Sequence, residues 1–261
     1  RVLGVSSGAP GRLEVERIGQ EPPVLFVHGS VVGAERTWRK QLPLAERWTL
    51  ILPSRPGFAG SPPLERGDFE AEAPLFAELL GDGAHLVGHS YGAVIALLVA
   101  TERPGAVRSL TVSEPGALRL AAGDPEVDAM IENGNTLYRD PESIPPEVFL
   151  RLFRSGVGSA NETPDQLPDW LAQGARLLKS ERPPWEAEIP LDRLARAGFP
   201  ALVISGGHST VFEKVCDVVA ERRGAERAVI PGRGHTIPSA GEPYNRRLER
   251  HLAASESMRP R

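Results

Sequence analysis

The chain has 261 residues, of which 41% are hydrophobic and 25% are charged, and its formal net charge is −4. That composition is typical of a globular protein with a sizeable core. Neither lysine nor arginine gathers into a patch, which argues against a nucleic-acid partner and against binding to a membrane surface. No apolar stretch approaches the ~20 residues that a membrane-spanning helix needs, and no signal peptide is recognisable, so we expect a cytoplasmic protein.

The predicted elements begin with a hairpin, because residues 1–7 and 12–19 are strand-like runs on either side of the turn sequence GAPG. Further apolar runs predict buried strands at residues 23–29, 48–53, 84–90, 107–115, 200–207 and 226–232. Helical patterns lie between them, at residues 36–47, 69–80, 91–103, 211–223 and 242–253. Strands that alternate with helices predict an α/β fold with a mostly parallel sheet and helices on both faces.

One long segment, residues 118–185, interrupts this alternation. It contains no strand-like run, only short helical pieces separated by DPES, IPPE and ERPPW. Because long insertions are usually functional, we interpret it as a helical cap over a core domain formed by residues 1–117 and 186–261. The alternative is an ordinary excursion of helices along one face of the sheet.

The sequence HLVGHSYGAVIALL, at residues 85–98, carries the strongest chemical signal. An apolar strand runs into Gly88-His89-Ser90-Tyr91-Gly92, and a helix follows at once. A serine in such a sharp turn has strained backbone geometry, and only small residues fit two positions before and two positions after it. The turn exposes the hydroxyl and directs a helix N-terminus toward it, which favours negative charge there. Ser90 is therefore the candidate nucleophile.

A serine hydroxyl is a poor nucleophile at neutral pH and needs a base. His235 follows the last predicted strand in IPGRGHTI, a glycine-lined loop where we expect an exposed, mobile ring, and it is the candidate base. The other five histidines are placed in a strand, in turns or in the terminal helix. We expect His85 within a strand, His89 directed into packing, His28 and His208 in turns, and His251 on the surface of the last helix.

At this point the chain resembles the α/β-hydrolase family over nearly its whole length. The resemblance is carried by GHSYG, by FVHGS at 26–30, by RPGFAGSP at 55–62 and by GRGH near the end. It implies the α/β-hydrolase fold. It also implies that the backbone N–H groups of Ser30 and Tyr91 form an oxyanion hole, in which one donor is typically worth about 10²–10³ in rate.

The acid of the expected triad is missing from its usual place. In similar relatives the turn after the strand read here as 200–207 contains an aspartate, but this chain has Gly206-Gly207-His208-Ser209. Glu114 ends another strand, in LTVSEPG, 24 residues after Ser90. In a parallel sheet the catalytic loops share the carboxyl edge, and a carboxylate at a buried strand end needs a partner. The resemblance adds that some haloalkane dehalogenases and zearalenone-type lactonases take their acid from this position.

We therefore predict Glu114 as the acid that orients His235. A solvated Glu114, with Glu213 or Asp217 as the acid, is the alternative. The predicted protein is a serine hydrolase that cleaves a small-molecule carboxylic ester or lactone through an acyl-enzyme. We expect no metal and no cofactor, because no dense group of ligands stands at metal-site spacing. Trp185, in RPPWEAEIP, either lines the substrate pocket or simply packs.

Other activities stay open on the same frame. A nucleophilic serine argues against dehalogenases and epoxide hydrolases of the family, which carry aspartate at that position. Carbon–carbon bond hydrolases, hydroxynitrile lyases and cofactor-free dioxygenases share a similar serine–histidine pair. A non-catalytic ligand receptor on the hydrolase scaffold is the alternative from a different class of protein. The turn at 206–209, which lacks the usual aspartate, is the feature that supports this alternative.

Overall fold

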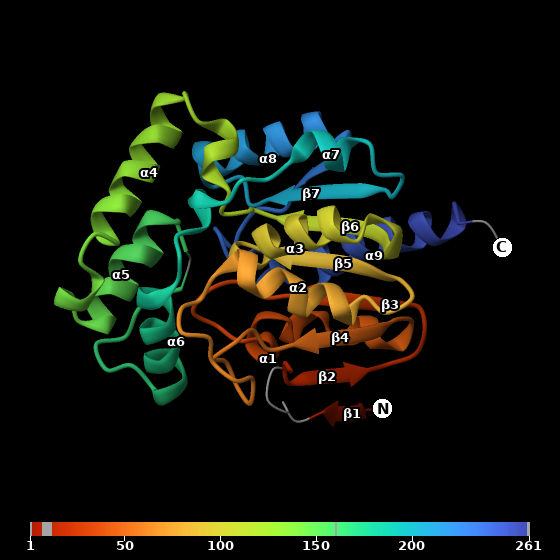
Figure 1. Ribbon diagram of the computed structural model, residues 1–261, viewed down its shortest axis with the longest axis horizontal. Coiled ribbons are helices and arrows are strands. Elements are labelled where there is room, and N and C mark those ends of the chain that lie inside the picture. Colours follow the sequence, from red (N-terminus) through yellow and green to blue (C-terminus); the bar gives the residue numbers. More distant parts are fainter. Residues whose placement is uncertain (1, 7–11, 160, 260–261) are drawn as a thin grey trace.

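The structure is a computed structural model that describes residues 2–6, 12–159 and 161–259, with the backbone alone at residues 2–6. Within these residues one sheet has eight strands in the order β1-β2-β4-β3-β5-β6-β7-β8 (Figure 1). The strands are β1 (Val2–Ser6), β2 (Val15–Ile18), β3 (Pro23–Val27), β4 (Thr49–Pro53), β5 (Ala84–His89), β6 (Val107–Ser113), β7 (Ala201–Ser205) and β8 (Glu226–Val229).

The sheet is mostly parallel, as predicted. β2 pairs antiparallel with β1 and with β4, and the neighbouring strands from β4 to β8 all pair in parallel. β1 and β2 are the two predicted hairpin strands, and the GAPG turn expected between them lies outside the described residues.

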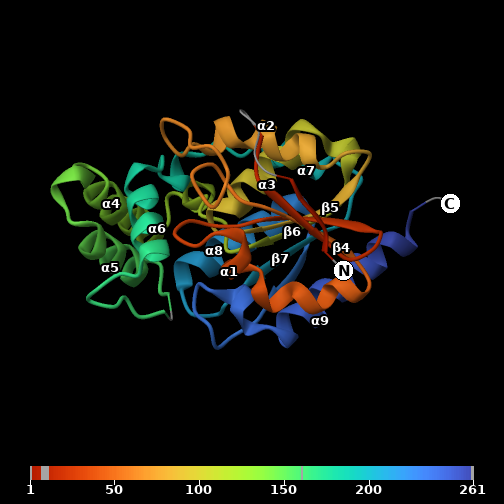
Figure 2. The same ribbon diagram turned by 90° about the horizontal axis from the view of Figure 1, so that it is seen from below.

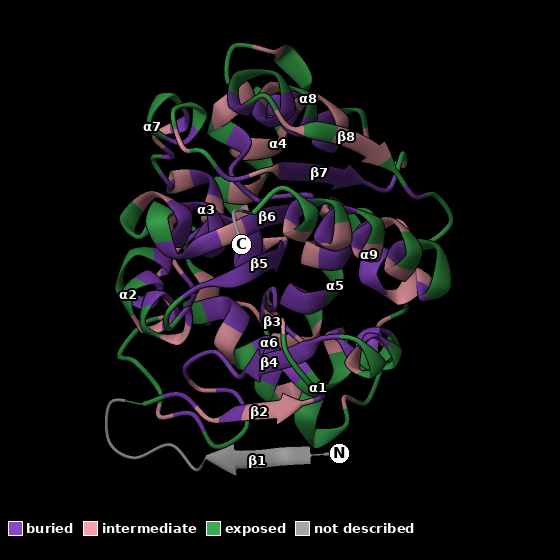
Figure 3. Ribbon diagram, turned by 90° about the vertical axis from the view of Figure 1, so that its right-hand side faces the viewer, coloured by how far each residue is buried: buried purple, intermediate pink, exposed green. Residues whose placement is uncertain are grey.

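The central strands are apolar throughout because both faces of the sheet are covered. In β3, Val24 and Phe26 pack into the hydrophobic cluster of one face, whereas Leu25 and Val27 pack into the cluster of the other. This alternation is the period-two geometry of a strand, and a parallel sheet covered by helices on both sides requires it. Figure 3 shows β5, β6 and β7 buried at the centre while the outer faces of the helices are exposed.

Two groups of helices cover the sheet. The helices α2 (Phe69–Leu79), α3 (Tyr91–Glu102), α7 (Leu191–Ala195) and α8 (Thr210–Arg223) contribute to the larger cluster. The helices α1 (Ala34–Thr37) and α9 (Glu242–Ser257) contribute to the cluster on the opposite face. Figure 2 shows α2 and α3 above the sheet and α9 below it.

The predicted helix at 36–47 is wrong in detail. The structure has the single turn α1 and then a 3-10 helix over Arg39–Glu46, which contains Pro43. Proline has no N–H and its ring clashes with the carbonyl four residues earlier, so a continuous α-helix is disfavoured there. The other four predicted helices match α2, α3, α8 and α9 closely, although α9 runs to Ser257.

The segment 118–185 is helical in its described part. Its α-helices are α4 (Pro125–Leu137), α5 (Pro146–Gly156) and α6 (Asp169–Ser180), and 3-10 turns span Leu118–Ala121, Pro141–Ser143 and Pro184–Glu186. Both ribbon views place α4, α5 and α6 together beyond the carboxyl ends of the parallel strands (Figures 1 and 2). We call this segment the helical insertion. Among the described residues, no helix is both long enough and apolar enough to cross a membrane.

Candidate active site

Ser90 lies in the sharp turn between β5 and α3. Its backbone has φ 55° and ψ −119°, a conformation that side-chain-bearing residues seldom adopt and that is often found at functional sites. The flanking glycines make the turn sterically possible. A Cβ on Gly88 would lie 2.6 Å from the Gly92 carbonyl oxygen, and a Cβ on Gly92 would lie 2.2 Å from the carbonyl oxygen of Val27. The turn thus packs backbone against backbone and holds the serine rigidly.

His235 stands between Ser90 and Glu114. Its Nε2 lies 2.8 Å from Ser90 Oγ, and its Nδ1 lies 2.6 Å from Glu114 Oε2. Because a carboxylate only accepts hydrogen bonds, Nδ1 carries the proton, and Nε2 is left to accept the proton of the serine. Three side chains that are remote in the sequence therefore form one continuous hydrogen-bonded chain.

The expectation of an exposed ring at His235 is wrong, since the residue is only 5% exposed. The Phe212 ring stacks on the imidazole with a centroid separation of 4.5 Å, and the His89 ring lies 5.1 Å away. The backbone N–H of His235 also donates to the carbonyl of Gly158, in the helical insertion. The loop is thus covered from α8 and from the insertion, which local glycine content could not reveal.

Glu114 is fully buried just beyond the end of β6. Its backbone N–H donates to the carbonyl of Ile204 in β7, and its φ of 40° then turns the side chain over the sheet edge. Oε1 accepts the N–H of Gly206 at 2.7 Å, while Oε2 accepts from His235. Burial alone would raise the pKa of Glu114, but the contacts with His208, His235 and Gly206 lower it to about 2. The carboxylate is therefore ionised at neutral pH.

The two rival acids are engaged elsewhere. Glu213 accepts the N–H of Gly207 at 3.0 Å and pairs with Arg227 at 2.6 Å. Asp217 pairs with the same arginine at 2.8 Å. Of the three carboxylates considered, the structure brings Glu114 to His235.

Four other histidines are buried and neutral. Burial lowers the pKa of His28, His85 and His89 to about 3 and that of His251 to about 4. His89 is directed into packing as expected, and its Nε2 donates to the His235 carbonyl at 2.7 Å. The surface position expected for His251 is wrong, because it is only 2% exposed. Its ring lies on the face of α9 that also carries Tyr244, Leu248 and Leu252, which packs on the sheet.

The predicted oxyanion donors flank the serine. Tyr91 is the first residue of α3, and Ser30 follows the His28-Gly29 pair after β3. A Cβ on Gly29 would lie 3.1 Å from the Ser90 Cβ, so this loop runs directly past the nucleophile. Neither amide donates to another protein group within the described part of the chain. Both N–H groups are thus available at the serine, and their role stays a prediction.

A buried ion network behind the oxyanion loop was not predicted. Arg55 lies between Glu72, with Nε–Oε2 at 2.7 Å, and Glu181, with Nη1–Oε1 at 2.9 Å. It also donates to the Gly29 carbonyl and lies 4.0 Å above the Tyr91 ring. Glu181 belongs to the helical insertion, and burial raises its pKa. The RPGFAGSP motif indicated Arg55, but no sequence pattern links it to its distant partners.

Glu181 also reaches the oxyanion loop itself, because Ser30 Oγ donates to its Oε2 at 2.5 Å. The same loop packs on α6, where a Cβ on Gly174 would lie 1.9 Å from the Val31 carbonyl oxygen. Val31 has φ 73°, an unusual value for a β-branched residue. The insertion therefore packs directly on the loop that follows β3, at a residue with an unusual backbone conformation.

A cavity of about 720 Å³ opens over Ser90 and His235. Its wall is mostly apolar and comes from the helical insertion and α8. Examples are Leu118, Met130, Leu137, Phe153, Trp185 and Phe212. Trp185 both lines this cavity and packs, since it is 6% exposed and its Nε1 donates to Asn135 Oδ1 at 2.8 Å.

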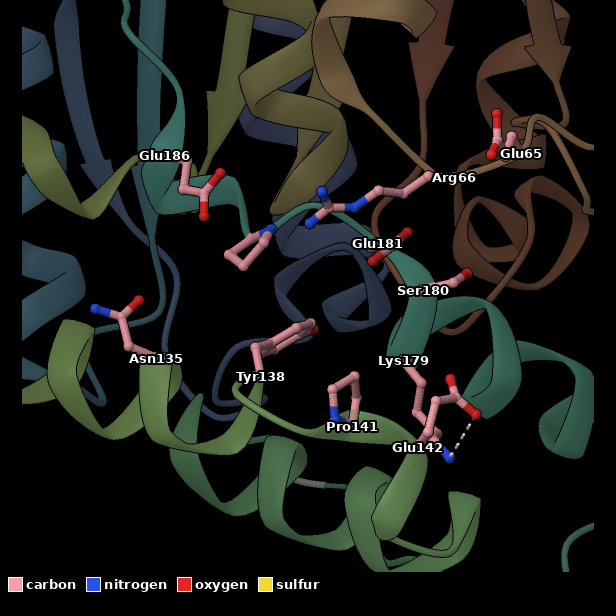
Figure 4. Close-up of a pocket in the computed structure, with 11 residues that line it drawn as sticks. Glu65, Arg66, Asn135, Tyr138, Pro141, Glu142, Lys179, Ser180, Glu181 and Glu186 are labelled. Atoms are coloured by element: carbon pink, nitrogen blue, oxygen red, sulfur yellow. Dashed lines mark ion pairs between the residues drawn. The ribbon is translucent and has the colours of Figure 1, made fainter.

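A second pocket of about 680 Å³ is polar and lies away from the nucleophile. Figure 4 shows Tyr138 at its centre, between Asn135 on one side and Lys179, which is 3.9 Å from Glu142, on the other. Tyr138 lines both pockets, so the apolar cavity and the polar pocket adjoin at this ring. Of the two, only the apolar cavity reaches the serine and the histidine.

Glu114, His208 and His235 carry carboxylate and imidazole atoms that all lie within 4.8 Å of one another. A zinc ion accepts such donors, but two ligands at ~2.0 Å in tetrahedral geometry stand about 3.3 Å apart. The Glu114 and His235 atoms are 2.6 Å apart. That separation fits a hydrogen bond between the two side chains.

With this geometry in view, the comparisons with known proteins decide the family. A family model described as the alpha/beta hydrolase family matches residues 24–247. The chain belongs to the α/β-hydrolase family. The resemblance and the fold inferred from the sequence are thereby confirmed.

Relatives of this α/β hydrolase include proteins that are named as an esterase and as a lipase. A pimeloyl-acyl-carrier-protein methyl ester esterase of Aeromonas hydrophila subsp. hydrophila is 27% identical over 252 residues, which cover 88% of this chain and 94% of the relative. Lipase LipV of Mycobacterium tuberculosis is 32% identical over 185 residues, 68% of this chain and 67% of that protein. The crystal structure of an alpha/beta hydrolase from Sphaerobacter thermophilus superposes with a TM-score of 0.67 at 22% identity, covering 97% of this chain and all of that one.

Proposed function

We propose that this protein is a serine hydrolase that cleaves a carboxylic ester or a lactone through an acyl-enzyme. The observation that carries the proposal is the chain of contacts from Ser90 Oγ through His235 to the buried Glu114, at 2.8 and 2.6 Å. A binding protein has no need to bury an ionised carboxylate behind a histidine, because such burial is unfavourable unless the charge is used or compensated.

The geometry supports the following sequence of steps. Ser90 Oγ attacks the substrate carbonyl carbon while His235 Nε2 takes the hydroxyl proton. Glu114 stabilises the imidazolium through the Nδ1–H bond. The N–H groups of Ser30 and Tyr91, together with the N-terminus of α3, hold the oxyanion. His235 then gives its proton to the departing alkoxide, and the alcohol leaves the acyl-enzyme.

Deacylation repeats these roles with water as the nucleophile. His235 removes a proton from the water, which attacks the acyl carbonyl, and the proton then returns to Ser90 Oγ as the ester bond to the serine breaks. The free acid and the original serine result. With a lactone, the alcohol and the acid remain parts of one product molecule.

The helical insertion, residues 118–185, serves as the cap of a core formed by residues 1–117 and 186–261. The support is its contribution to the wall of the 720 Å³ cavity over the serine. An apolar wall binds an apolar acyl or alcohol group by removing its surface from water. Trp185 belongs to this wall, and we assign it to the substrate pocket. The names of the esterase and lipase relatives agree with an ester substrate.

The test is a series of p-nitrophenyl esters of increasing acyl chain length, assayed beside several lactones. We expect ester or lactone turnover that Ser90→Ala removes. Diketones, cyanohydrins and hydroxyquinolones, assayed in parallel, examine the carbon–carbon hydrolase, lyase and dioxygenase alternatives. Turnover of one of these, with none of the esters or lactones, would contradict the proposal.

Covalent labelling separates an enzyme from a receptor on the same scaffold. A fluorophosphonate probe requires an activated serine hydroxyl, so it should label the wild-type protein and not the Ser90→Ala variant. His235→Ala should abolish labelling as well. An unlabelled wild-type protein would favour the receptor, and full labelling of His235→Ala would place the base elsewhere.

A further inference from the structure

His208 lies beside the catalytic carboxylate, on the side opposite His235. Its Nδ1 is 3.3 Å from Glu114 Oε1, whereas His235 bonds to Oε2. Its Nε2 is 3.1 Å from the Val157 carbonyl oxygen, at the end of α5 in the helical insertion. The two histidine rings are separated by 6.4 Å between centroids. The mechanism above uses His235 alone and leaves this second ring without a role.

Both ring nitrogens of His208 face oxygen atoms that can only accept hydrogen bonds. A neutral imidazole has one N–H and one lone pair. If Nε2–H donates to Val157, the Nδ1 lone pair confronts the carboxylate, and if Nδ1–H donates to Glu114, the contact with Val157 is lost. An imidazolium, with two N–H groups, donates to Val157 from Nε2 and places its positive charge at ion-pair distance from the carboxylate. The geometry alone therefore favours the charged form.

The charges around His208 agree with that form. Its contact with Glu114 raises the pKa of His208, against the opposing effect of partial burial, and Glu213 of α8 adds a further negative charge. Arg227 of β8 is positive, but it pairs with Glu213 and Asp217. His235 shares the Glu114 carboxylate, and the neighbouring His89, whose ring lies 5.1 Å from that of His235, is neutral because burial lowers its pKa to about 3.

One short segment of the helical insertion holds both histidines. A Cβ on Gly158 would lie 2.7 Å from His208 Cδ2, so the ring packs directly on the insertion backbone. The Gly158 carbonyl accepts the N–H of His235 at 3.2 Å, and Ser159 forms a β-bridge with Gly234. Residues 157–159 thus contact the His208 ring and the loop of the catalytic base.

We propose that His208 is a positioning residue of the triad: as an imidazolium it holds Oε1 of Glu114, leaves Oε2 to His235, and ties the carboxylate to the insertion at Val157. The proposal rests on the serine hydrolase function proposed above. It gives a role to the turn at 206–209, where this chain has no aspartate.

The charge on His208 has a consequence with a definite sign. A second positive charge near His235 disfavours the imidazolium form of the base. Removing the charge should move the acid limb of the kcat/KM profile to higher pH by about half a pH unit or more. A purely structural role for His208 would leave that limb in place.

Two neutral variants separate the two contacts. In His208→Asn, the side-chain amide nitrogen can occupy the position of Nδ1 and keep the contact with Glu114. In His208→Gln, the side-chain amide nitrogen can occupy the position of Nε2 and keep the contact with Val157. We expect His208→Asn to retain kcat within about threefold and to raise KM. We expect His208→Gln to lower kcat about tenfold or more, because the acid is less well positioned, with KM little changed.

Both variants should shift the acid limb upward, and circular dichroism and thermal unfolding verify that each is folded. Equal kcat values in the two variants, or an acid limb that neither variant moves, would overturn the proposal. A readout independent of turnover is the ¹⁵N resonance of the His208 ring in Ser90→Ala protein at neutral pH. Two protonated nitrogens are expected, and a neutral ring would refute the charged form.

The proposed function and this inference can fail separately. If the wild-type protein neither hydrolyses esters nor reacts with the fluorophosphonate, the hydrolase proposal is wrong, whatever the His208 resonance shows. If the wild-type protein is active and labelled but the His208 ring is neutral, only the role of His208 is wrong.

Discussion

The turn between β5 and α3 and the helical insertion border the same cavity, but different contacts hold them in place. In the turn, Gly88 and Gly92 let backbone approach backbone so closely that a single Cβ would clash. The insertion joins the core by apolar packing on α8 and also by polar contacts between distant segments. The polar contacts include the pair Arg55–Glu181, the bond from His235 N–H to Gly158, and the contact of His208 with Val157. The nucleophile is thus built locally, whereas its acid, base and cover are assembled from distant parts of the chain.

This difference implies that variants of the two regions should fail in different ways. Changes in the turn should abolish the geometry of the nucleophile or the fold itself. Changes at contacts with the insertion should alter how well an otherwise intact core works. Changes at the acid should combine both kinds of effect. Glu114 belongs to the core, but its carboxylate contacts His208, whose ring also bonds to Val157 of the insertion.

The largest expected effect is that of Glu114→Gln on turnover. The amide cannot provide the negative charge that stabilises the imidazolium of His235, so kcat for ester hydrolysis should fall by about 10²–10⁴. Glu213→Gln is the matched control, since Glu213 pairs with Arg227 rather than with the base. Steady-state kinetics at saturating substrate measures both. A loss in Glu213→Gln with none in Glu114→Gln would reverse the assignment of the acid.

Replacing one glycine by alanine in each region compares how tightly the two regions are packed. Gly92→Ala places a Cβ 2.2 Å from the Val27 carbonyl oxygen and should destabilise the fold by about 3 kcal/mol or more, with loss of activity. Gly156→Ala, at the end of α5 in the insertion, meets nothing within 4 Å and should be neutral or mildly stabilising. Denaturant unfolding compares the two. Similar losses in both variants would contradict the contrast.

Glu114 should also make stability depend on pH in the acid range. Its pKa is about 2 in the folded protein against an ordinary value of 4.5. The unfolded chain therefore binds this proton more readily, and the stabilisation is present above about pH 4.5 and is lost as the pH falls toward 2. A pKa shift of this size contributes about 3 kcal/mol to the free energy of unfolding at neutral pH. In Glu114→Gln, the fall in unfolding free energy between pH 5 and 2 should be smaller, and an unchanged fall would show that other groups cause it.

The contrast between the regions also explains what the sequence could predict. The strand, the tight turn and the helix around Ser90 are consecutive in the chain, so their pattern predicts the nucleophile. Two errors were avoidable in principle. Pro43 argues against a long helix after β3, and the three-to-four-residue spacing of Tyr244, Leu248, His251 and Leu252 predicts a buried face on α9. Both signals are local.

The remaining errors concern contacts between distant segments. The ring of His235 is buried by Phe212 and by the insertion, and no pattern near residue 235 encodes that cover. The same is true of Glu181, which follows α6 and meets Arg55 from a different part of the chain. Glu114 could be predicted because parallel strands end at one edge of the sheet. Sequence reasoning could thus place the Glu114 carboxylate near His235, because topology restricts the neighbours of a strand end.

The smallest expected effect tests how firmly the insertion is joined to the oxyanion loop. Glu181→Gln keeps the shape of the side chain but removes one of two carboxylates that neutralise the buried Arg55, and it weakens the bond from Ser30 Oγ. Since hydrogen bonds to charged groups contribute about 1.5–3 kcal/mol, we expect a loss of stability in that range, measured by denaturant unfolding.

Glu186→Gln is the control for this exchange, because Glu186 pairs with Arg182 near the surface, with its side chain 38% exposed. Exposed pairs contribute about 0–1 kcal/mol, so the control should lose less than Glu181→Gln. The core also retains the Arg55–Glu72 pair when Glu181 is changed. The Glu181→Gln variant should therefore still react with the fluorophosphonate at Ser90, only more slowly. Complete loss of labelling would show that the oxyanion loop depends on the insertion for its shape, and that the core site is not formed independently.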